Sequence, residues 1–310
     1  MHLGQIRYLR HHEIEHKKWD NCIDQAANSL PYPYSWYLNA MSPHWDGLVL
    51  GNYEAVMPLT WKRKWGIHYL HQPYYMQQLG VFALQMPDAD LVSCFLGAIP
   101  PHFRYIDFYM NEKNFFALSP EFQALERQNY LLDLSQNYAA ISKQYSRCVT
   151  RRLKLALTHY RIVDHPFEPD INVSFLAQRL QMNGKKLDPI YFQRLRVALS
   201  EANDRGMLKC HHVFDKEDKL SAVSAAICSK NRVINISGSA LPEARQNGAM
   251  YLLLDTLIRE YAETDNYLDF EGSMVPGIAA FYAQFGGKPV SYWQVLCNRL
   301  PWLLKKWRQT

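Results

Sequence analysis

Long apolar runs are absent from this sequence. No segment approaches the roughly 20 consecutive apolar residues that a membrane-spanning helix requires. The opening segment, MHLGQIRYLRHHEIEHKKWD, also lacks the apolar centre of a secretory signal peptide. We therefore expect neither a membrane span nor secretion, and a cytoplasmic location is the resulting expectation.

Closely spaced cysteine pairs are absent as well. The six cysteines lie far apart, and none forms a CxxC motif. This spacing argues against a disulfide framework and a zinc site, and it favours reduced, mostly buried thiols. The adjacent pair His211–His212 does not change this, because neighbouring side chains on a strand face opposite sides. We expect no metal site.

Acidic residues are missing from two segments that contain many basic ones. No Asp or Glu lies between Leu134 and Val163 or after Glu271. The basic residues of the first segment are Lys143, Arg147, Arg151, Arg152, Lys154 and Arg161. Such segments indicate an anionic partner, which could be a phosphate-rich cofactor, RNA or lipid headgroups, or they form a solvated charged face. Both interpretations remain open.

The second acid-free segment ends in LPWLLKKWRQT. It places Trp302 and Trp307 beside Lys305 and Lys306, a mixture typical of helices that lie at a membrane surface. Peripheral binding to the inner face of a membrane through this tail is one prediction. The alternative is that the tail docks on the body of the protein.

The composition is that of a globular protein with two domains. Of the 310 residues, 48% are hydrophobic and 20% are charged. Apolar periodicity predicts helices at 13–30, 88–99, 138–160, 175–182, 189–205 and 248–262, and one from Pro276 to Gly286–Gly287. The runs 208–214, 219–228 and 232–241 predict an antiparallel meander. Further strands are predicted within 45–70, at 72–82 and at 288–296.

A short phrase occurs twice, as YIDF at 105–108 and as YLDF at 267–270. In each half of the chain, the predicted order is strands, a helix and then this phrase. We therefore expect two tandem α/β units, residues 1–133 and 134–310, each with a mixed, mostly antiparallel sheet flanked by helices. Because both copies contain an Asp at this position, Asp107 and Asp269, we interpret these residues as structural and expect them to hold the turn after the strand. Glu271 replaces Tyr109 at the position that differs, and is the better candidate for chemistry.

The junction SGSALPEARQNGAM has the features of an anion site. A predicted strand enters a loop with Arg245 and Gly248, and a long helix follows. A helix N-terminus presents unpaired amides and partial positive charge, which suit a pyrophosphate. Gly248 would allow the pyrophosphate to approach the backbone closely, and Arg245 would add a charge-assisted hydrogen bond to it.

These residues resemble the GNAT acyltransferase superfamily. Its acyl-coenzyme A pattern, Q/R-x-x-G-x-G/A, reads Arg245-Gln246-Asn247-Gly248-Ala249-Met250 here, with Met at the last position. The resemblance implies donor binding by a set that comprises Ile236, Ser237, Gly238, Arg245, Asn247, Gly248 and Ala249. Amides around Ile236 to Gly238 would polarise the acyl carbonyl. The family's Tyr-x-x-x-Gly phrase matches Tyr282 to Gly286, which implies that Tyr282 protonates the leaving group.

The DFxGS phrase at 269–273 and the G-I-x-x-F-x-x-x-F-G phrase at 277–286 are similar to the Fem-type peptidoglycan aminoacyltransferases. The basic segment 145–156 is similar to a helix of those proteins. This resemblance implies transfer of an acyl or aminoacyl group from a thioester or a tRNA to an amine, often on a cell-wall precursor. The first half lacks a glycine loop before its helix, so we expect the donor site in the second half.

The sequence thus predicts an N-acyltransferase without a permanently bound cofactor. Its donor would be acyl-coenzyme A or aminoacyl-tRNA, and its acceptor an amine on a cell-wall or lipid-linked precursor. Glu271 would accept the amine's proton. Lys143, Arg147, Arg151, Arg152 and Lys154 would bind tRNA or a pyrophosphate group, and Gln77 and Gln78 could line a substrate cleft or belong to the core. The alternative is a non-catalytic module of the same fold that binds a nucleotide, RNA or lipid headgroup.

Overall fold

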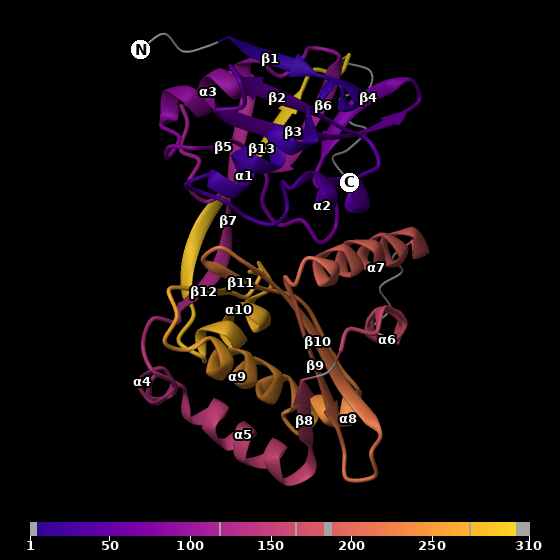
Figure 1. Ribbon diagram of the computed structural model, residues 1–310, viewed down its shortest axis with the longest axis vertical. Helices are drawn as coiled ribbons and strands as arrows, with labels where there is room; N and C mark the ends of the chain where they lie inside the picture. The colour runs from indigo at the N-terminus through magenta and orange to yellow at the C-terminus, as the bar shows by residue number, and fades with distance from the viewer. Residues whose placement is uncertain (1–4, 118, 165, 183–187, 273, 302–310) are drawn as a thin grey trace. The chain divides into compact units, whose positions relative to one another are not determined.

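The computed structural model describes residues 5–117, 119–164, 166–182, 188–272 and 274–301. They form two compact units, one ending at Arg127 and resuming at Ser291, the other running from Gln128 to Val290. Both combine strands with flanking helices (Figure 1). The expected α/β class is confirmed. The tail from Trp302 lies outside the described residues.

Unit 1 contains a mixed sheet with helices packed on it. The strands, in spatial order, are β1 (Ile6–Leu9), β2 (Trp45–Leu50), β3 (Ala55–Lys64), β4 (Ile67–His71), β6 (Phe103–Tyr109) and β13 (Lys288–Asn298). Neighbours pair antiparallel, except that β6 runs parallel to β4. A short strand, β5 (Phe82–Ala83), pairs with β3. The helices are η1 (His11–Glu13), α1 (His16–Gln25), α2 (Ser35–Met41) and α3 (Ala89–Gly97).

Unit 2 repeats this strand order and orientation. Its strands are β8 (Arg161–Asp164), β9 (Leu208–Phe214), β10 (Leu220–Ser229), β11 (Arg232–Ala240), β12 (Tyr267–Asp269) and β7 (Phe122–Asp133). Again one neighbouring pair, β11 with β12, is parallel and the others are antiparallel. The helices are α4 (Tyr138–Lys143), α5 (Arg147–His159), α6 (Pro169–Met182), α7 (Pro189–Asp204), α8 (Pro242–Gln246), α9 (Ala249–Tyr261) and α10 (Pro276–Ala283).

The last strand of each sheet comes from the other half of the sequence. The end of β7, at 131–133, pairs with β12, whereas residues 294–298 of β13 pair with β6. The chain passes from unit 1 into unit 2 between residues 127 and 128, close to the boundary expected near 133. It returns to unit 1 at Ser291, which the expected division did not include. The shared strand order is compatible with two copies of one unit.

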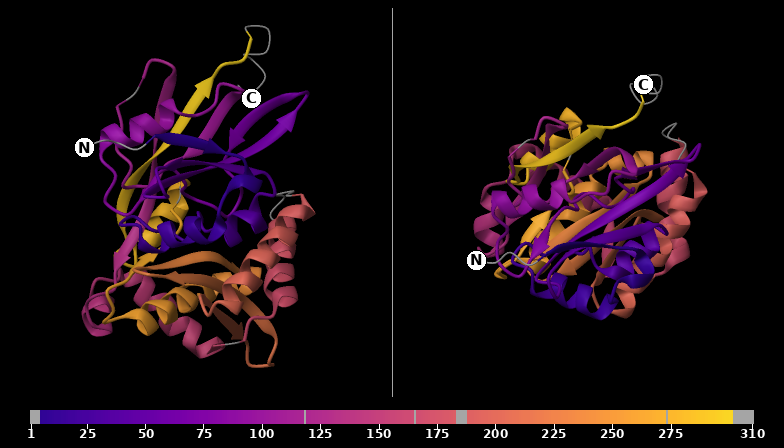
Figure 2. Two further views of the ribbon diagram at one scale, coloured as in Figure 1. Left: turned by 45° about the horizontal axis from the view of Figure 1, so that its top comes forward. Right: turned by 90° about the horizontal axis from the view of Figure 1, so that it is seen from above.

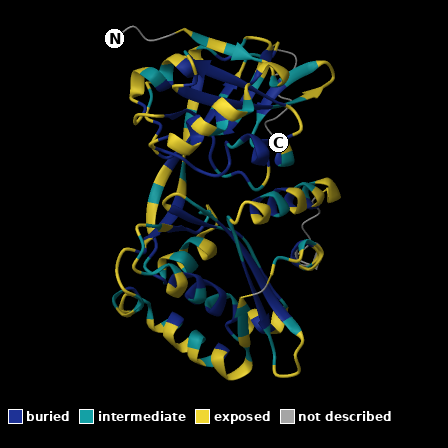
Figure 3. Cartoon of the chain, in the orientation of Figure 1, coloured by how far each residue is buried: buried dark blue, intermediate teal, exposed yellow. Residues whose placement is uncertain are grey.

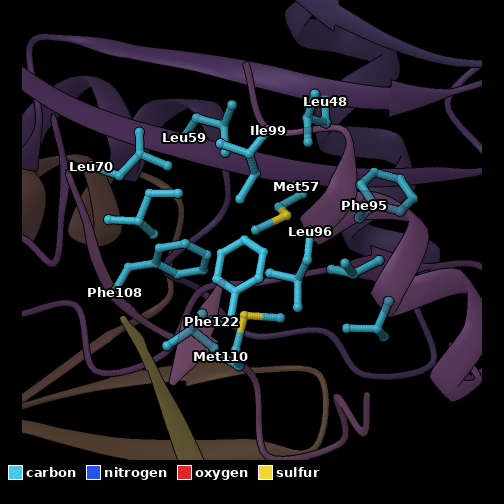
Figure 4. Packing of buried hydrophobic residues seen from close by; sticks show 14 of the residues in the cluster. Leu48, Met57, Leu59, Leu70, Phe95, Leu96, Ile99, Phe108, Met110 and Phe122 are labelled. Carbon is cyan, nitrogen blue, oxygen red and sulfur yellow. The ribbon is translucent and has the colours of Figure 1, made fainter. Parts of the chain in front are cut away.

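Each unit has its own hydrophobic core. In unit 1, Phe95 and Leu96 of α3 pack against strand residues such as Met57 and Phe108 (Figure 4). In unit 2, the core joins α5, α9 and the sheet, with Leu268 and Phe270 fully buried. The meander predicted at 208–241 is confirmed as β9, β10 and β11.

Two predicted elements were wrong. The helix predicted at 138–160 is two helices, because Ser146 caps α5 by accepting a hydrogen bond from the Val149 amide at 3.3 Å. The strand predicted at 72–82 is mostly loop: among its described residues, Phe82 belongs to a strand and Leu79 forms an isolated bridge with Met110. Its polar side chains bond to nearby backbone groups instead: Gln72 accepts from the Tyr109 amide at 3.0 Å.

The repeated aspartates occupy equivalent places in the two sheets. Asp107 is opposite Leu296 of β13 and accepts a hydrogen bond from the Gln294 side chain at 2.6 Å. Asp269 is opposite Leu131 of β7 and accepts from the Asn129 side chain at 3.0 Å. In both units, the residue whose side-chain amide donates this bond lies two positions before the residue opposite the aspartate. Asp269 also accepts from the Glu271 amide at 2.8 Å, so its predicted role in holding the turn is confirmed.

Asp269 has an additional buried partner. Its carboxylate lies 3.2 Å from the guanidinium of Arg232, and both residues are buried. We expect Asp269→Asn to lower the free energy of unfolding by about 3–5 kcal/mol, because it leaves a buried guanidinium without its counter-charge. Denaturant unfolding measures this loss. Asp107→Asn is the matched control with a smaller expected loss, and equal losses in the two variants would contradict the ion-pair explanation.

Candidate active site in unit 2

The candidate site lies where β11 and β12 separate. Their parallel pairing covers Arg232 to Ile234 in the described part of the chain, while the other edge of β11 stays paired with β10 as far as Ala240. The edge of β11 beyond Ile234 is thus released from β12. The released edge includes Ile236 to Gly238, the segment whose amides the resemblance assigns to the acyl carbonyl.

A cavity of about 690 Å³ opens beside this strand end. Its lining residues are Arg152, Leu176, Gly238, Ser239, Ala240, Arg245, Met250, Tyr251, Val275, Gly277, Ile278, Phe281, Tyr282 and Gln284. Two arginines belong to this wall, and no Asp or Glu occurs among these described lining residues. The remaining wall is largely apolar. Such a cavity suits a ligand with an anionic group and an uncharged arm.

Four of the predicted site residues meet in this cavity, namely Gly238, Arg245, Arg152 and Tyr282. Asn247 instead lines a smaller, polar cavity of about 290 Å³ beside Tyr160 and Lys219. Ile236 and Ala249 are buried next to the site, and Ser237 is half-buried on β11.

Gly248 begins α9 in the left-handed conformation, with φ of 94°. A Cβ atom there would lie 2.6 Å from the carbonyl oxygen of Arg152 in α5. The close approach that this glycine permits is therefore to α5. Arg152 completes the contact by donating a hydrogen bond to the carbonyl of Gln246. Gly248 thus fixes the start of α9 and the position of Arg152 in the cavity wall.

Tyr282 stands on α10, and its ring stacks on Phe270 with centroids 4.7 Å apart. Burial, followed by the charges of Glu271 and Asp269, raises the pKa of Tyr282. The hydroxyl therefore stays protonated at neutral pH. Glu271 is half-buried, has φ of 55° and is not among the cavity's lining residues. Its carboxylate still acts on Tyr282 through charge.

The remaining basic residues of the predicted anion site face outward. α5 packs on α9 through Val149 and Ala156, which are fully buried. Arg147, Arg151 and Lys154 are exposed on the same helix, and Lys143 is exposed at the end of α4. The structure brings Arg152 alone of this predicted set into the lining of the cavity.

Gln77 and Gln78 lie in unit 1 and stabilise a loop. Gln78 is buried, donates to the Gln77 side chain at 2.9 Å and accepts from the Glu112 amide at 2.7 Å. These bonds account for Gln78 as a structural residue. The adjacent histidines of unit 2 point to different partners, His211 to Glu260 at 3.0 Å and His212 to Asn172 at 3.1 Å.

Sequence reasoning missed several wall residues, among them Tyr251 and Gln284. Tyr251 packs edge-on against Phe281 at 4.8 Å, and its hydroxyl lies 3.9 Å from the Cys148 sulfur. Gln284 has a buried side-chain oxygen without a hydrogen-bond partner. The available signal was that Tyr251 directly follows the RxxGxM phrase and that Gln284 lies inside the YxxxG phrase. Met250 also enters the cavity, since its terminal carbon lies 3.0 Å from where a Cβ of Gly238 would be.

Among the described residues, no three His, Cys, Asp or Glu side chains gather closely enough to hold a metal ion. In the same residues, no helix combines the length and apolar character needed to cross a bilayer.

A family model described as acetyltransferase (GNAT) domain matches residues 143–297, which is half of the chain. The chain belongs to this family. A search of curated proteins by sequence gave no match.

Solved structures share the fold at low sequence identity. FemX is 12% identical with a TM-score of 0.61, covering 93% of this chain and 96% of its own. A conserved protein of unknown function from Bacteroides thetaiotaomicron is 11% identical with a TM-score of 0.60, covering 95% and 100%. The C-terminal domain of an Agrobacterium fabrum protein named as a lysylphosphatidylglycerol synthetase is 11% identical with a TM-score of 0.54, covering 91% of each chain.

The role of Gly248 gives a stability prediction. Gly248→Ala is expected to lower the free energy of unfolding by about 1–3 kcal/mol, because a side chain at this φ is strained and meets the Arg152 carbonyl. Gly277→Ala is the control, because Gly277 lies in α10 with open space around its Cα and should gain stability or stay unchanged. Thermal unfolding of both variants checks this, and an unaffected Gly248→Ala protein would contradict it.

Proposed function

We propose that unit 2 is an N-acyltransferase whose donor occupies the 690 Å³ cavity. The observation that carries the proposal is the wall of that cavity, which joins two arginines, an open strand end and Tyr282 without an acidic residue among the described lining positions. The anionic part of the donor would contact Arg152 and Arg245. The acyl group would lie along Gly238 to Ala240, where backbone amides can polarise its carbonyl.

The reaction would be direct transfer. The acceptor amine attacks the acyl carbon, a C–N bond forms, and the bond from the acyl carbon to the sulfur or oxygen of the donor breaks. Glu271 accepts the proton of the amine, directly or through water. Tyr282 donates a hydrogen bond or its proton to the leaving atom.

The raised pKa of the Tyr282 hydroxyl determines what it can donate to the leaving group of each candidate donor. A thiol has a pKa of about 8.5, below the ordinary tyrosine value and further below that of Tyr282 after its upward shift. A departing thiolate would therefore take a hydrogen bond from Tyr282, whereas a ribose alkoxide, a stronger base, would take the proton. Acyl-coenzyme A and aminoacyl-tRNA both remain candidate donors. The acceptor in the proposal is an amine on a cell-wall or lipid-linked precursor.

Tyr282→Phe and Glu271→Gln test the catalytic assignment. Each should lower kcat by about 10²-fold or more, because Glu271→Gln removes the proton acceptor and Tyr282→Phe removes the hydroxyl that stabilises or protonates the leaving atom, and each should leave donor binding intact. Tyr267→Phe and Glu263→Gln are controls, since both residues are exposed and outside the cavity lining. Full turnover by both test variants would contradict the assignment.

Thermal shift tests the donor site independently of turnover. Acetyl-coenzyme A or coenzyme A at about 100 times Kd should stabilise the protein by about 2.7 kcal/mol, and Arg245→Gln should reduce this effect. Stabilisation by aminoacyl-tRNA with none by coenzyme A selects the tRNA donor. The absence of stabilisation by any of these ligands would contradict the donor site.

A non-catalytic binding module is the second candidate, and the Met250 side chain inside the cavity favours it. If Met250 restricts an otherwise competent site, Met250→Ala should tighten coenzyme A binding, measured by calorimetry, because it frees volume beside Gly238. Met274→Ala is the control, since Met274 is exposed and is not a lining residue. Donor binding without turnover for wild type and Met250→Ala would select the binding module.

A further inference from the structure

The hairpin of β3 and β4 in unit 1 has features that acyl transfer does not explain. The two strands stay paired as far as Lys64 and Ile67, so that Trp65 and Gly66 alone form the turn. The hairpin extends past the neighbouring strands of unit 1 (Figures 1 and 2). Its tip is exposed (Figure 3).

Trp65 is an unfavourable residue for this turn. Its φ is 50° and that of Gly66 is 79°, as in the two-residue turns in which both residues adopt positive φ. Such turns favour Asn, Asp or Gly at the first position, since these residues tolerate positive φ. Trp65 is also 71% exposed, so core packing does not offset the strain. A strained and exposed aromatic residue at a tip indicates a functional requirement.

The strands beside the turn supply positive charge on both faces of the hairpin. Lys62 and Lys64 project to one face and Arg63 to the other, because strand side chains alternate. The Lys64 ammonium lies 4.8 Å from the centre of the Trp65 ring. No Asp or Glu occurs in the sequence between Glu54 and Asp88. The tip therefore carries basic charge around an aromatic apex.

Aromatic packing holds the base of the hairpin. Trp61 of β3 stacks on His44 with ring centroids 4.9 Å apart. His68 of β4 packs edge-on against the Trp61 ring, with centroids 5.2 Å apart. These contacts fix the two strands just below the charged segment. The tip is thus presented on a supported hairpin.

We propose that this tip, Lys62 to Gly66, docks end-on on an anionic phospholipid surface. Trp65 enters the headgroup region, where tryptophan is favoured, and the three basic side chains contact lipid phosphates. A convex apex with charge on both faces fits a planar surface. Single-stranded nucleic acid is instead bound in basic grooves with successive stacking rings, which this tip does not provide. The proposal is independent of acyl transfer.

Sedimentation of the full-length protein with vesicles tests this docking. The vesicles are phosphatidylcholine with one third phosphatidylglycerol, compared with pure phosphatidylcholine. Wild type should pellet with the anionic vesicles and be released by high salt. The variant with Lys62, Arg63 and Lys64 all changed to Gln should lose about 100-fold in partition coefficient, because each basic residue near the surface contributes about fivefold.

Trp65→Asn separates docking from folding. Asn is favoured at this turn position, so the Tm should stay equal or rise while the partition coefficient falls about fivefold or more. Phe115→Asn is the control, because Phe115 is 63% exposed elsewhere in unit 1 and should leave binding unchanged.

Pelleting of Trp65→Asn and of the triple variant at the wild-type level would overturn the proposal, because binding would then come from another part of the chain. Failure of wild type to pellet would overturn it too. Preferential binding of the wild-type tip to a single-stranded RNA over anionic vesicles, lost in the same variants, would also overturn it.

Discussion

The buried carboxylate of Asp269 is the constraint on which the site of unit 2 depends. It is the last residue of β12 and bonds to Asn129, to Arg232 and to the amide of Glu271. Because β12 stops there, β11 continues without a parallel partner, and a cavity opens at its free edge. The same carboxylate holds the turn that places Glu271 where its charge acts on Tyr282. One structural aspartate thus stands both where the sheet opens and at the turn that carries Glu271.

The second constraint is the close contact between α5 and the start of α9. Gly248 lets the two backbones meet, and Arg152 both donates to the carbonyl of Gln246 and lines the cavity. A basic helix that the sequence marked as a surface for an anion therefore also supports the helix N-terminus beside the cavity. Arg152 both supports the start of α9 and lines the cavity, while its neighbours Arg151 and Lys154 are exposed. Positive charge inside the cavity is thus fixed by packing as well as by side-chain type.

The sequence predicted local structure well where the signal was local. The apolar runs of β9, β10 and β11 and the periodicity of α9 have lengths that identify them. It failed where one residue changed the outcome, as at Ser146, whose cap divides a periodic stretch into α4 and α5. It also failed at 72–82, where β-forming residues lie in a loop because Gln72 and Gln78 bond to backbone groups from other segments. These are long-range contacts, which a local pattern does not encode.

The sequence by itself determined the α/β class, the doubled YIDF and YLDF phrase, and the residue types of the candidate site, because these depend on periodicity and on motifs within a few residues. Only the tertiary structure decided that β7 and β13 each end in the other half's sheet, since strand pairing joins segments far apart in the chain. It likewise decided that Arg152, Arg245 and Tyr282 share one cavity while Gln77 and Gln78 support a loop. The physical reason is that a cavity is formed by side chains from several elements, and packing selects which of them face it.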